Sequence, residues 1–172
     1  PDGTPEVDMN DCLKSSLRMR PDRIIVGEVR GPECATLLTA MNTGHDGSFG
    51  SLHANTAQET VTRMINPPMN VPPIMLTGLD LIIIQARLHV NGKTARKITE
   101  VAEIAGMEGS KPRLNTIWKY NAHTDQIEET GIPSNLREVI CRAAGVTPDV
   151  FEKHVNQRQQ IIEDLVARGI SD

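Results

Sequence analysis

Residues 23–65 alternate short apolar runs with helix-like segments, and this alternation is the strongest constraint on the fold. "RIIVG" and "SFGSLH" are typical of buried strands. In "PECATLLTAMNTG", Pro32 suits a first helical turn and Gly44 a helix C-cap. In "TAQETVTRMI", Thr56 and Glu59 have the spacing of a capping box. The order strand, helix, strand, helix predicts an α/β fold with a parallel sheet and a right-handed crossover.

The segments on either side of this unit give weaker signals. Asp8 is a suitable N-cap for a helix over residues 9–19, which Pro21 would end. "NPPMNVPP", residues 66–73, interrupts the pattern and marks the clearest internal boundary, and "IMLTG" after it resembles a helical turn.

The second half of the chain predicts two hairpins followed by helices. Residues 79–90 and 94–106 would form the first hairpin around the turn Asn91-Gly92. "RLNTIWKYN" and "QIEET" would form a second hairpin around "AHTD". "PSNLREVICRAAG" predicts a helix capped by Ser134 and ended by Gly145, and a last helix begins near Pro148.

Composition narrows the class of protein. A length of 172 residues suits one domain, or one domain with an appendage, and 38% hydrophobic residues suit a globular core. The net charge of −4 gives no electrostatic case for binding nucleic acid. The three cysteines include no CxxC pair, which favours a reducing compartment over a disulfide framework or a zinc ribbon. No apolar run is long enough to span a bilayer and no signal peptide is recognisable, so we expect a cytoplasmic protein. The opening "PDGTPE" lacks a Met and resembles a loop, so we expect the chain to begin inside a longer protein.

The stretch "GHDGSFGSLHANT" holds two histidines, His45 and His53, among small and polar residues. A metal site, a hydrolytic centre and a phosphate sensor are the alternatives. On an extended strand eight residues span roughly 26 Å, so the two histidines would share an ion only on a folded-back loop. No carboxylate or thiol lies at ligand spacing, and a G-x-S-x-G elbow is absent from the sequence. These points favour a phosphate sensor.

Glu28 gives that interpretation a chemical partner. It follows the strand "RIIVG", and ligands in parallel sheets bind at the carboxyl ends of the strands. A glutamate there can orient and deprotonate a water that attacks a γ-phosphate, and it can help to hold magnesium; the alternative is a surface glutamate that begins a loop. His53 would emerge beside it from the neighbouring strand, in contact with the γ-phosphate or its water. His45 follows a helix C-terminus, where the helix dipole alone favours a histidine.

These segments, quoted in order, resemble a known family. "LKSSLRMRPDRIIVGEVRGPE" and "LLTAMNTGHDGSFGSLHANTAQETVTRMI" are similar to the secretion ATPases of type II and type IV machines, including type IV pilus motors and the archaeal pilus and archaellum motors. In that family "RPD-hhhVGE-hR" is an atypical Walker B segment, "TGH…hxTLHxNxA" is a histidine box, and "IIIQARL" resembles a later strand. The resemblance covers roughly residues 9–105.

The resemblance implies a partial RecA-like P-loop NTPase sheet, followed by a β-hairpin region and C-terminal helices, within an ATP- and Mg²⁺-dependent homo-hexamer. Glu28 matches the Walker B glutamate, and His45 and His53 match the histidines of the box. Arg30 and Arg63 match recurring arginines that act either as struts within the domain or as contacts across a subunit interface. The implied metal contacts are indirect. The implied partner is an integral membrane platform protein, and the implied location is the cytoplasmic face of the membrane.

The departures from the family pattern define what this chain can do alone. Gly27 occupies the position where an ordinary Walker B has its aspartate, which is usual for this family and leaves magnesium to be held largely through water and the P-loop. The 172 residues contain no G-x-x-x-x-G-K-[ST] motif, which we expect upstream. A four-cysteine zinc module is also missing, which favours the archaeal branch. The resemblance divides the chain into residues 1–66 (Walker B and histidine box), 67–110 (remaining strands of the ATPase domain) and 111–172 (a mostly helical appendage). We expect the chain alone to be inactive; the alternative is a non-enzymatic docking module, distinguished by the absence of a P-loop from the whole gene.

Overall fold

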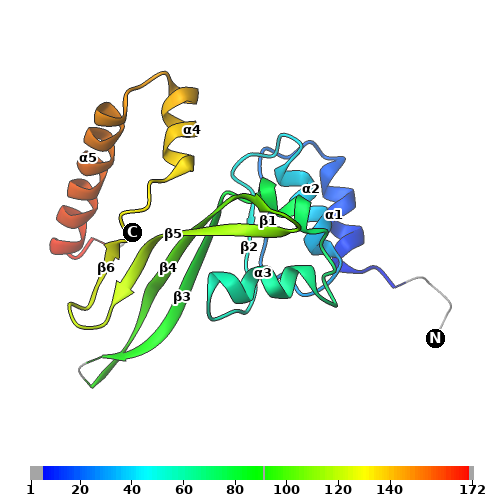
Figure 1. Cartoon of the computed structure of the whole chain (residues 1–172), viewed down its shortest axis with the longest axis horizontal. Coiled ribbons are helices and arrows are strands. Elements are labelled where there is room, and N and C mark those ends of the chain that lie inside the picture. The colour runs from blue at the N-terminus through cyan, green and yellow to red at the C-terminus, as the bar shows by residue number, and fades with distance from the viewer. Residues whose placement is uncertain (1–5, 91, 171–172) are drawn as a thin grey trace. The chain divides into compact units, whose positions relative to one another are not determined.

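The computed structural model describes residues 6–90 and 92–170, which form two compact units: one that ends at Pro133 and one that begins at Ser134 (Figure 1). The first unit opens with α1, Met9–Leu17. The Asp8 carboxylate accepts a hydrogen bond from Asp11 N at 2.8 Å, which confirms the predicted N-cap. The helix ends before Pro21, at Leu17 rather than at residue 19.

The strand–helix alternation predicted for residues 23–65 is confirmed. The elements are β1 (Ile25–Val26), α2 (Glu33–Met41), β2 (Phe49–Gly50) and α3 (Ala57–Ile65). The two strands are parallel neighbours, with Ile25 opposite Phe49. The class of fold is therefore mixed α/β, as the alternation indicated.

The prediction that both strands are buried is wrong for one face of this pair. Val26 is 6% exposed, whereas Ile25 is 64% exposed and Phe49 is 57% exposed. Successive side chains of a strand point to opposite faces, so one face packs on the core while the other lies bare. Both residues of β2 are exposed, although a Cβ on Gly50 would meet Leu37 Cδ2 at 2.9 Å.

The end of α2 also differs from the prediction. Gly44 was expected as the C-cap, but the C-cap is Asn42. The Asn42 side chain donates from Nδ2 to Leu38 O at 2.9 Å, and its backbone N donates to the same carbonyl at 3.0 Å. These bonds satisfy the Leu38 carbonyl, and the helix ends at Asn42, two residues before Gly44. Gly44 lies in the following turn with φ of 90°.

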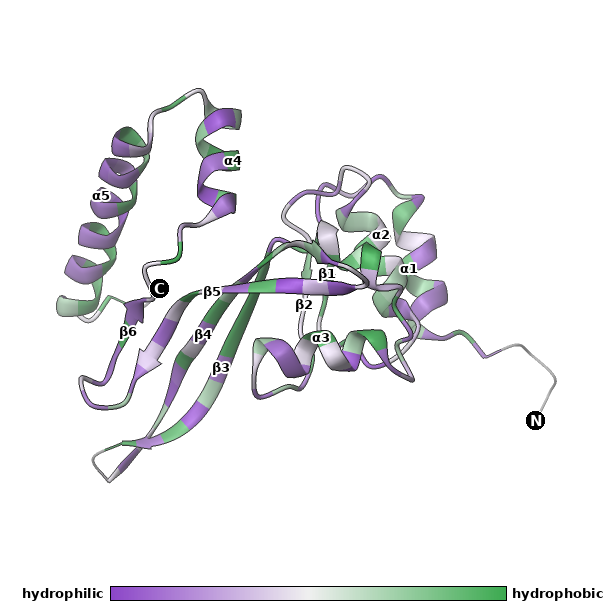
Figure 2. Cartoon of the chain, viewed as in Figure 1, coloured by the Kyte–Doolittle hydropathy of each residue, from purple (hydrophilic) through white to green (hydrophobic). Residues whose placement is uncertain are grey.

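A four-stranded antiparallel sheet follows the proline-rich segment. The 3-10 helix η1 (Pro73–Gly78) confirms the expected helical turn, and the sheet has the order β3-β4-β5-β6. Its strands are Leu81–Val90, Lys93–Glu108, Lys111–Asn121 and Gln126–Glu129. Both predicted hairpins are present, although Asn91 of the first turn lies outside the described residues. Hydrophobic and hydrophilic residues alternate along β5 in Figure 2, as a sheet with one packed face requires.

The core of the first unit lies between these two sheets and the short helices. Leu38 of α2, Leu76 of η1 and Ala102 of β4 are at most 1% exposed. They belong to one cluster of buried residues that extends from Leu13 to Ala102 along the chain. The core is aliphatic, in keeping with an aromatic content of 2%.

The second unit is a helix pair, α4 (Asn135–Ala144) and α5 (Pro148–Ala167). The predicted caps of α4 are confirmed, because Ser134 Oγ accepts from Arg137 N at 3.0 Å and Gly145 has a left-handed φ of 64°. Arg137 and Glu152 form an ion pair of 2.8 Å between the two helices.

Contacts divide the chain after Pro133, because residues 111–129 continue the sheet as β5 and β6. The predicted division of the chain at residues 66 and 110 follows the family resemblance and does not coincide with the boundary between the two compact units. It stays a prediction. Within the described residues, none of the helices has both the length and the apolar character needed to cross a bilayer.

Candidate phosphate-binding site

Residues 24–29 include β1 and the segment that follows it, and Ser51 bonds to the backbone at the end of this stretch. Ser51 N donates to Val26 O at 3.3 Å, and Val29 N donates to Ser51 O at 2.7 Å. The Ser51 hydroxyl also donates to Gly27 O at 2.5 Å. These three bonds bracket Glu28, so its side chain and the residues after Ser51 emerge at the same edge of the parallel pair.

Glu28 is the centre of a three-residue charge cluster. Its Oε2 accepts from Arg30 Nη2 at 2.5 Å, and its Oε1 lies 3.2 Å from His53 Nε2. The Glu28 side chain is 31% exposed, whereas those of Arg30 and His53 are 76% and 87% exposed. The structure thus brings together Glu28 and His53, the two residues that the sequence paired at neighbouring strand ends.

The charges around Glu28 favour its ionised form. The hydrogen bond from Arg30 holds the pKa of the Glu28 carboxyl below its usual value, against the partial desolvation that raises it, and the charges of Arg30 and His53 act in the same direction as the hydrogen bond. The same pair raises the pKa of Arg30. Glu28 Oε1 is buried and accepts no hydrogen bond within the described residues, and His53 Nε2 lies at ion-pair distance from it.

A pocket of about 270 Å³ opens at this cluster. Glu28, Arg30 and His53 line it, and its remaining wall consists of Val29, Arg63, Pro67, Pro68 and Met69. Four of the five predicted site residues, Glu28, Arg30, His53 and Arg63, therefore share one cavity. This set of groups suits an anionic ligand. The two guanidinium groups can bind the anion, and the carboxylate can accept a hydrogen bond from a water beside it.

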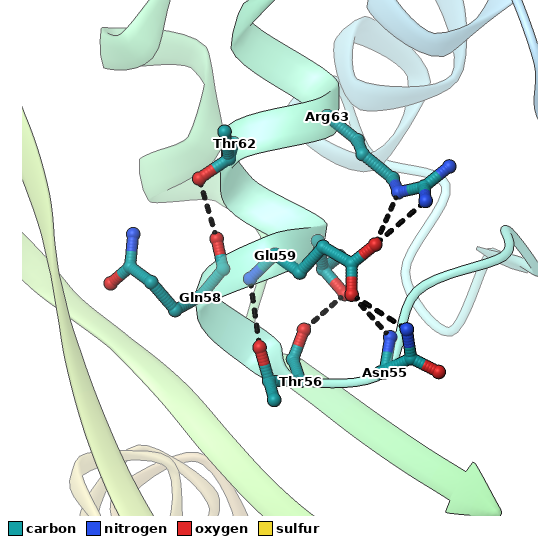
Figure 3. Close-up of polar contacts among 7 residues, drawn as sticks. Asn55, Thr56, Gln58, Glu59, Thr62 and Arg63 are labelled. Atoms are coloured by element: carbon teal, nitrogen blue, oxygen red, sulfur yellow. Dashed lines mark hydrogen bonds and ion pairs between the residues drawn. The ribbon is translucent and has the colours of Figure 1, made fainter.

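Arg63 reaches this pocket from α3, where Glu59 holds it (Figure 3). Arg63 Nε donates to Glu59 Oε1 at 2.8 Å, and its Nη2 lies 2.6 Å from the same oxygen. Glu59 Oε2 accepts from Asn55 N at 2.8 Å and from Asn55 Nδ2 at 3.0 Å. Hydrogen bonds from the Asn55 backbone and from Arg63 lower the pKa of Glu59, against its partial desolvation.

The capping box predicted at Thr56 and Glu59 is half correct. Thr56 Oγ1 accepts from Glu59 N at 3.0 Å, as predicted. The Glu59 carboxylate, however, accepts from the backbone of Asn55 rather than from that of the N-cap residue. Glu59 therefore fixes the segment between His53 and α3 in addition to capping the helix.

His45 is not among the residues that line the pocket. It lies in the turn between α2 and β2, where its carbonyl accepts from the Ser48 hydroxyl at 2.7 Å. Ser48 Oγ in turn accepts from Ile24 N at 2.9 Å, so this turn is joined to the start of β1. The Nδ1 atom of His45 is buried without a hydrogen bond among the described residues.

Two acidic residues that support the site were not singled out from the sequence. Glu33 accepts from Arg30 N and Gly31 N, and Glu100 accepts from Ala57 N at the start of α3 at 2.8 Å. An acid in a first helical turn is a local signal that could have indicated Glu33. Glu100 gives no such signal, because its partner lies in a different part of the sequence.

Within residues 6–90 and 92–170, no three His, Cys, Asp or Glu side chains converge in a way that could hold a metal ion. Magnesium in nucleotide sites needs only one or two carboxylates, with waters and phosphate oxygens as the other ligands. Glu28 lines the pocket with a carboxylate whose pKa is lowered, which fits that indirect role.

The mixed α/β unit carries an acid and a histidine at the ends of its parallel strands, the edge at which ligands bind in such sheets. The chain matches the sequence profile described as type II/IV secretion system protein over residues 2–169 and belongs to this family. Its relatives include an uncharacterised protein of Methanocaldococcus jannaschii, which is 33% identical over 162 residues, 93% of this chain and 59% of that protein. The type IV pilus assembly ATPase PilB of Pseudomonas aeruginosa is 43% identical over 81 residues, 46% of this chain and 14% of PilB.

Among solved structures, the VirB11 ATPase of the Brucella suis type IV secretion system, in complex with sulphate, is 30% identical with a TM-score of 0.48. The match covers 56% of this chain and 32% of VirB11. The chain thus spans about three fifths of the archaeal relative and smaller parts of the other two proteins.

Proposed function

We propose that these residues form the water-activating and phosphate-sensing part of an ATPase that powers secretion or pilus or archaellum assembly. The observation that carries the proposal is the 3.2 Å approach of His53 Nε2 to Glu28 Oε1 in a pocket that Arg30 and Arg63 also line. Membership of the type II/IV secretion family, and a relative named as a pilus assembly ATPase, support this reaction over other uses of the same groups.

In the proposed reaction Glu28 orients the attacking water and accepts its proton. The neighbouring guanidinium of Arg30 keeps the pKa of Glu28 low, so the carboxylate is ionised and can accept a hydrogen bond from the water. Glu28 would help to hold Mg²⁺ through water, and the metal would supply neutralisation of phosphate charge there. The exposed His53 would contact the γ-phosphate or its water and change partners when that phosphate leaves.

The other predicted residues have supporting roles in the proposal. Arg30 and Arg63 line the anion-facing wall, and each is oriented by a carboxylate, Glu28 or Glu59. They serve either as struts within the domain or as contacts across a subunit interface. His45 would act in the turn after α2, away from the pocket lining, as a hinge, an interface contact or a helix cap.

The whole protein, in this proposal, is a cytoplasmic homo-hexamer that acts at the membrane on an integral platform protein. Residues 1–66 and 67–110 would belong to its RecA-like domain, and residues 111–172 would be an appendage of the archaeal type. The phosphate-cradling G-x-x-x-x-G-K-[ST] motif is absent from these 172 residues, so we expect the chain alone to turn over no ATP. Its absence from the whole gene would favour the docking module instead.

The direct test is Glu28→Gln in the whole protein that carries this chain. The amide keeps the shape of the side chain but cannot accept the proton, so ATP turnover should fall on the order of 10²- to 10⁴-fold, the usual contribution of a general base. The matched control is Glu129→Gln, an exposed carboxylate on β6, which should leave turnover unchanged. Full activity of the Glu28 variant would refute the assignment.

A further inference from the structure

Glu33 is a buried charged residue beside the candidate site, and the proposed reaction has so far given it no role. Its side chain is among the least exposed of the acidic ones, at 6% for the residue. A carboxylate loses hydration when it is buried, so it must find donors in the protein. The Glu33 donors are the backbone amides of Arg30 and Gly31, at 2.6 and 2.9 Å.

Both amides donate to the same oxygen, Oε1. The loop therefore folds closely around the carboxyl group, and a Cβ added to Gly31 would lie only 3.1 Å from Glu33 Oε2. Burial would raise the pKa of Glu33, but these backbone donors outweigh it and lower the pKa overall, so the acceptor is ionised. Glu33 is also the first residue of α2, whose Leu37 and Leu38 are buried in the core.

Glu28 consequently lies in a segment with two restraints on its backbone. Ser51 bonds to Gly27 O and to Val29 N, the residues immediately before and after Glu28. Further along the loop, Glu33 accepts from the amides of Arg30 and Gly31. The second restraint fixes the backbone of Arg30, the residue whose guanidinium pairs with Glu28.

We propose that Glu33 is a positioning residue, which holds the loop of residues 28–31 so that the Glu28–Arg30 pair faces the pocket. This inference rests on the proposed function for its catalytic consequence but not for its structural one. Glu33 would not touch substrate; it would act through the backbone of Arg30. Misplacement of a reacting group by about 1 Å can cost 10²-fold in rate, so loss of this restraint has a large expected effect.

The structural part of the proposal is tested on this chain by amide hydrogen exchange. In Glu33→Ala the amides of Arg30 and Gly31 lose their acceptor and should exchange at least about 10-fold faster, as locally opened amides do. Glu33→Gln retains a carbonyl Oε1 in the same place, so both amides should remain protected. Unchanged protection in a folded Glu33→Ala chain would overturn the proposal, and so would equal loss of protection in the Gln variant.

The catalytic part is tested in the whole protein. Glu33→Ala should lower kcat on the order of 10- to 100-fold with a change in the KM for ATP of less than about 3-fold, because the geometry of the reacting groups changes more than the binding of ATP. Glu33→Gln should recover most of kcat, and Glu129→Ala should change neither constant. A loss of kcat that is equal in the Ala and Gln variants would overturn the positioning role.

If Glu33→Ala does not fold, the Gln variant and Gly31→Ala decide the question. The added Cβ of Gly31→Ala would crowd Glu33 Oε2, so kcat should fall while the core of α2 stays intact. Normal kcat in Gly31→Ala would contradict the proposal. If the unsubstituted whole protein hydrolyses no ATP, the proposed function fails, while the exchange result still decides whether Glu33 holds the loop.

Discussion

At the scale of single residues, the two oxygens of Glu28 have different surroundings. Oε2 is bound to Arg30, whereas Oε1 is buried beside His53 without a hydrogen bond. The hydrogen bond from Arg30 therefore orients the carboxylate so that its other oxygen lies beside His53.

The Arg30 pair leads to a pH prediction for Arg30→Gln in the whole protein. Its hydrogen bond to Glu28 is the largest influence that lowers the pKa of Glu28, so its loss should raise that pKa. Because Glu28 must be ionised to accept a proton, the acid limb of the profile of kcat/KM against pH should move to higher pH. The profile is measured by steady-state ATP turnover, with the exposed Arg96→Gln as control. An acid limb that stays in place would show that Arg30 does not set the ionisation of Glu28.

Sequence reasoning found the residues that carry the chemistry and missed two acids, Glu33 and Glu100, that accept from backbone amides around them. Glu28 and His53 could be paired because both follow strands that the apolar pattern indicates. The roles of Arg30 and Arg63 could not be separated, because their partners Glu28 and Glu59 depend on side-chain direction. Glu33 accepts from amides only two and three residues away, so its place in the first turn of α2 was a local signal that could have indicated it.

At the scale of elements, α3 is held at its N-terminus by side chains from two places. Thr56 and Glu59 are local, whereas Glu100 comes from β4 and accepts from Ala57 N. The same Glu100 accepts from Thr116 Oγ1 of β5 at 2.9 Å. The helix that follows His53 is thereby joined to the antiparallel sheet.

We expect Glu100→Ala to destabilise the first unit by about 1–3 kcal/mol, because the Ala57 amide and the Thr116 hydroxyl lose a charged acceptor at a partly buried position. The free energy of unfolding of this chain in urea measures the effect. Glu108→Ala, an exposed acid at the end of the same strand, should change it by less than about 0.5 kcal/mol. Equal stability of the two variants would contradict a structural role for Glu100.

The elements themselves were predicted best where a cap or turn is local. Asp8, Ser134 and Gly145 mark helix ends because their conformations depend on a few neighbouring residues. The bare face of Ile25 and Phe49 was missed, because an apolar run indicates a strand without indicating how many layers cover it. The pairing of β4 with β5 joins the two predicted hairpins into one sheet, and this contact has no signal within either hairpin.

At the scale of the whole molecule, the buried cluster lies entirely in the first unit. Its members and the partly buried residues packed on it extend from Leu13 to Leu114. In the second unit, α5 has no buried residue, and Figure 2 shows hydrophobic and hydrophilic positions mixed along it. The two units therefore differ in what stabilises them.

A chain that ends after Pro133 should fold, because it keeps this cluster and all four strands of the antiparallel sheet. Amide hydrogen exchange should show protected amides in α2, β3 and β4, with protection similar to that in the 172-residue chain. A matched truncation after Asn121, which removes β6, should lose protection at the edge of β5. Failure of the longer truncation to fold would show that the helix pair is needed for the core.

The three hydrogen bonds of Ser51 also have a mechanical consequence. Ser51 bonds to the backbone on both sides of Glu28, and the segment that follows it carries His53 to the amide of Ala57, which Glu100 holds. If His53 senses a phosphate as proposed, a displacement of His53 would act on the bonds at Gly27 and Val29 on one side and on the bond at Glu100 on the other. The parallel pair and the antiparallel sheet would then share the load.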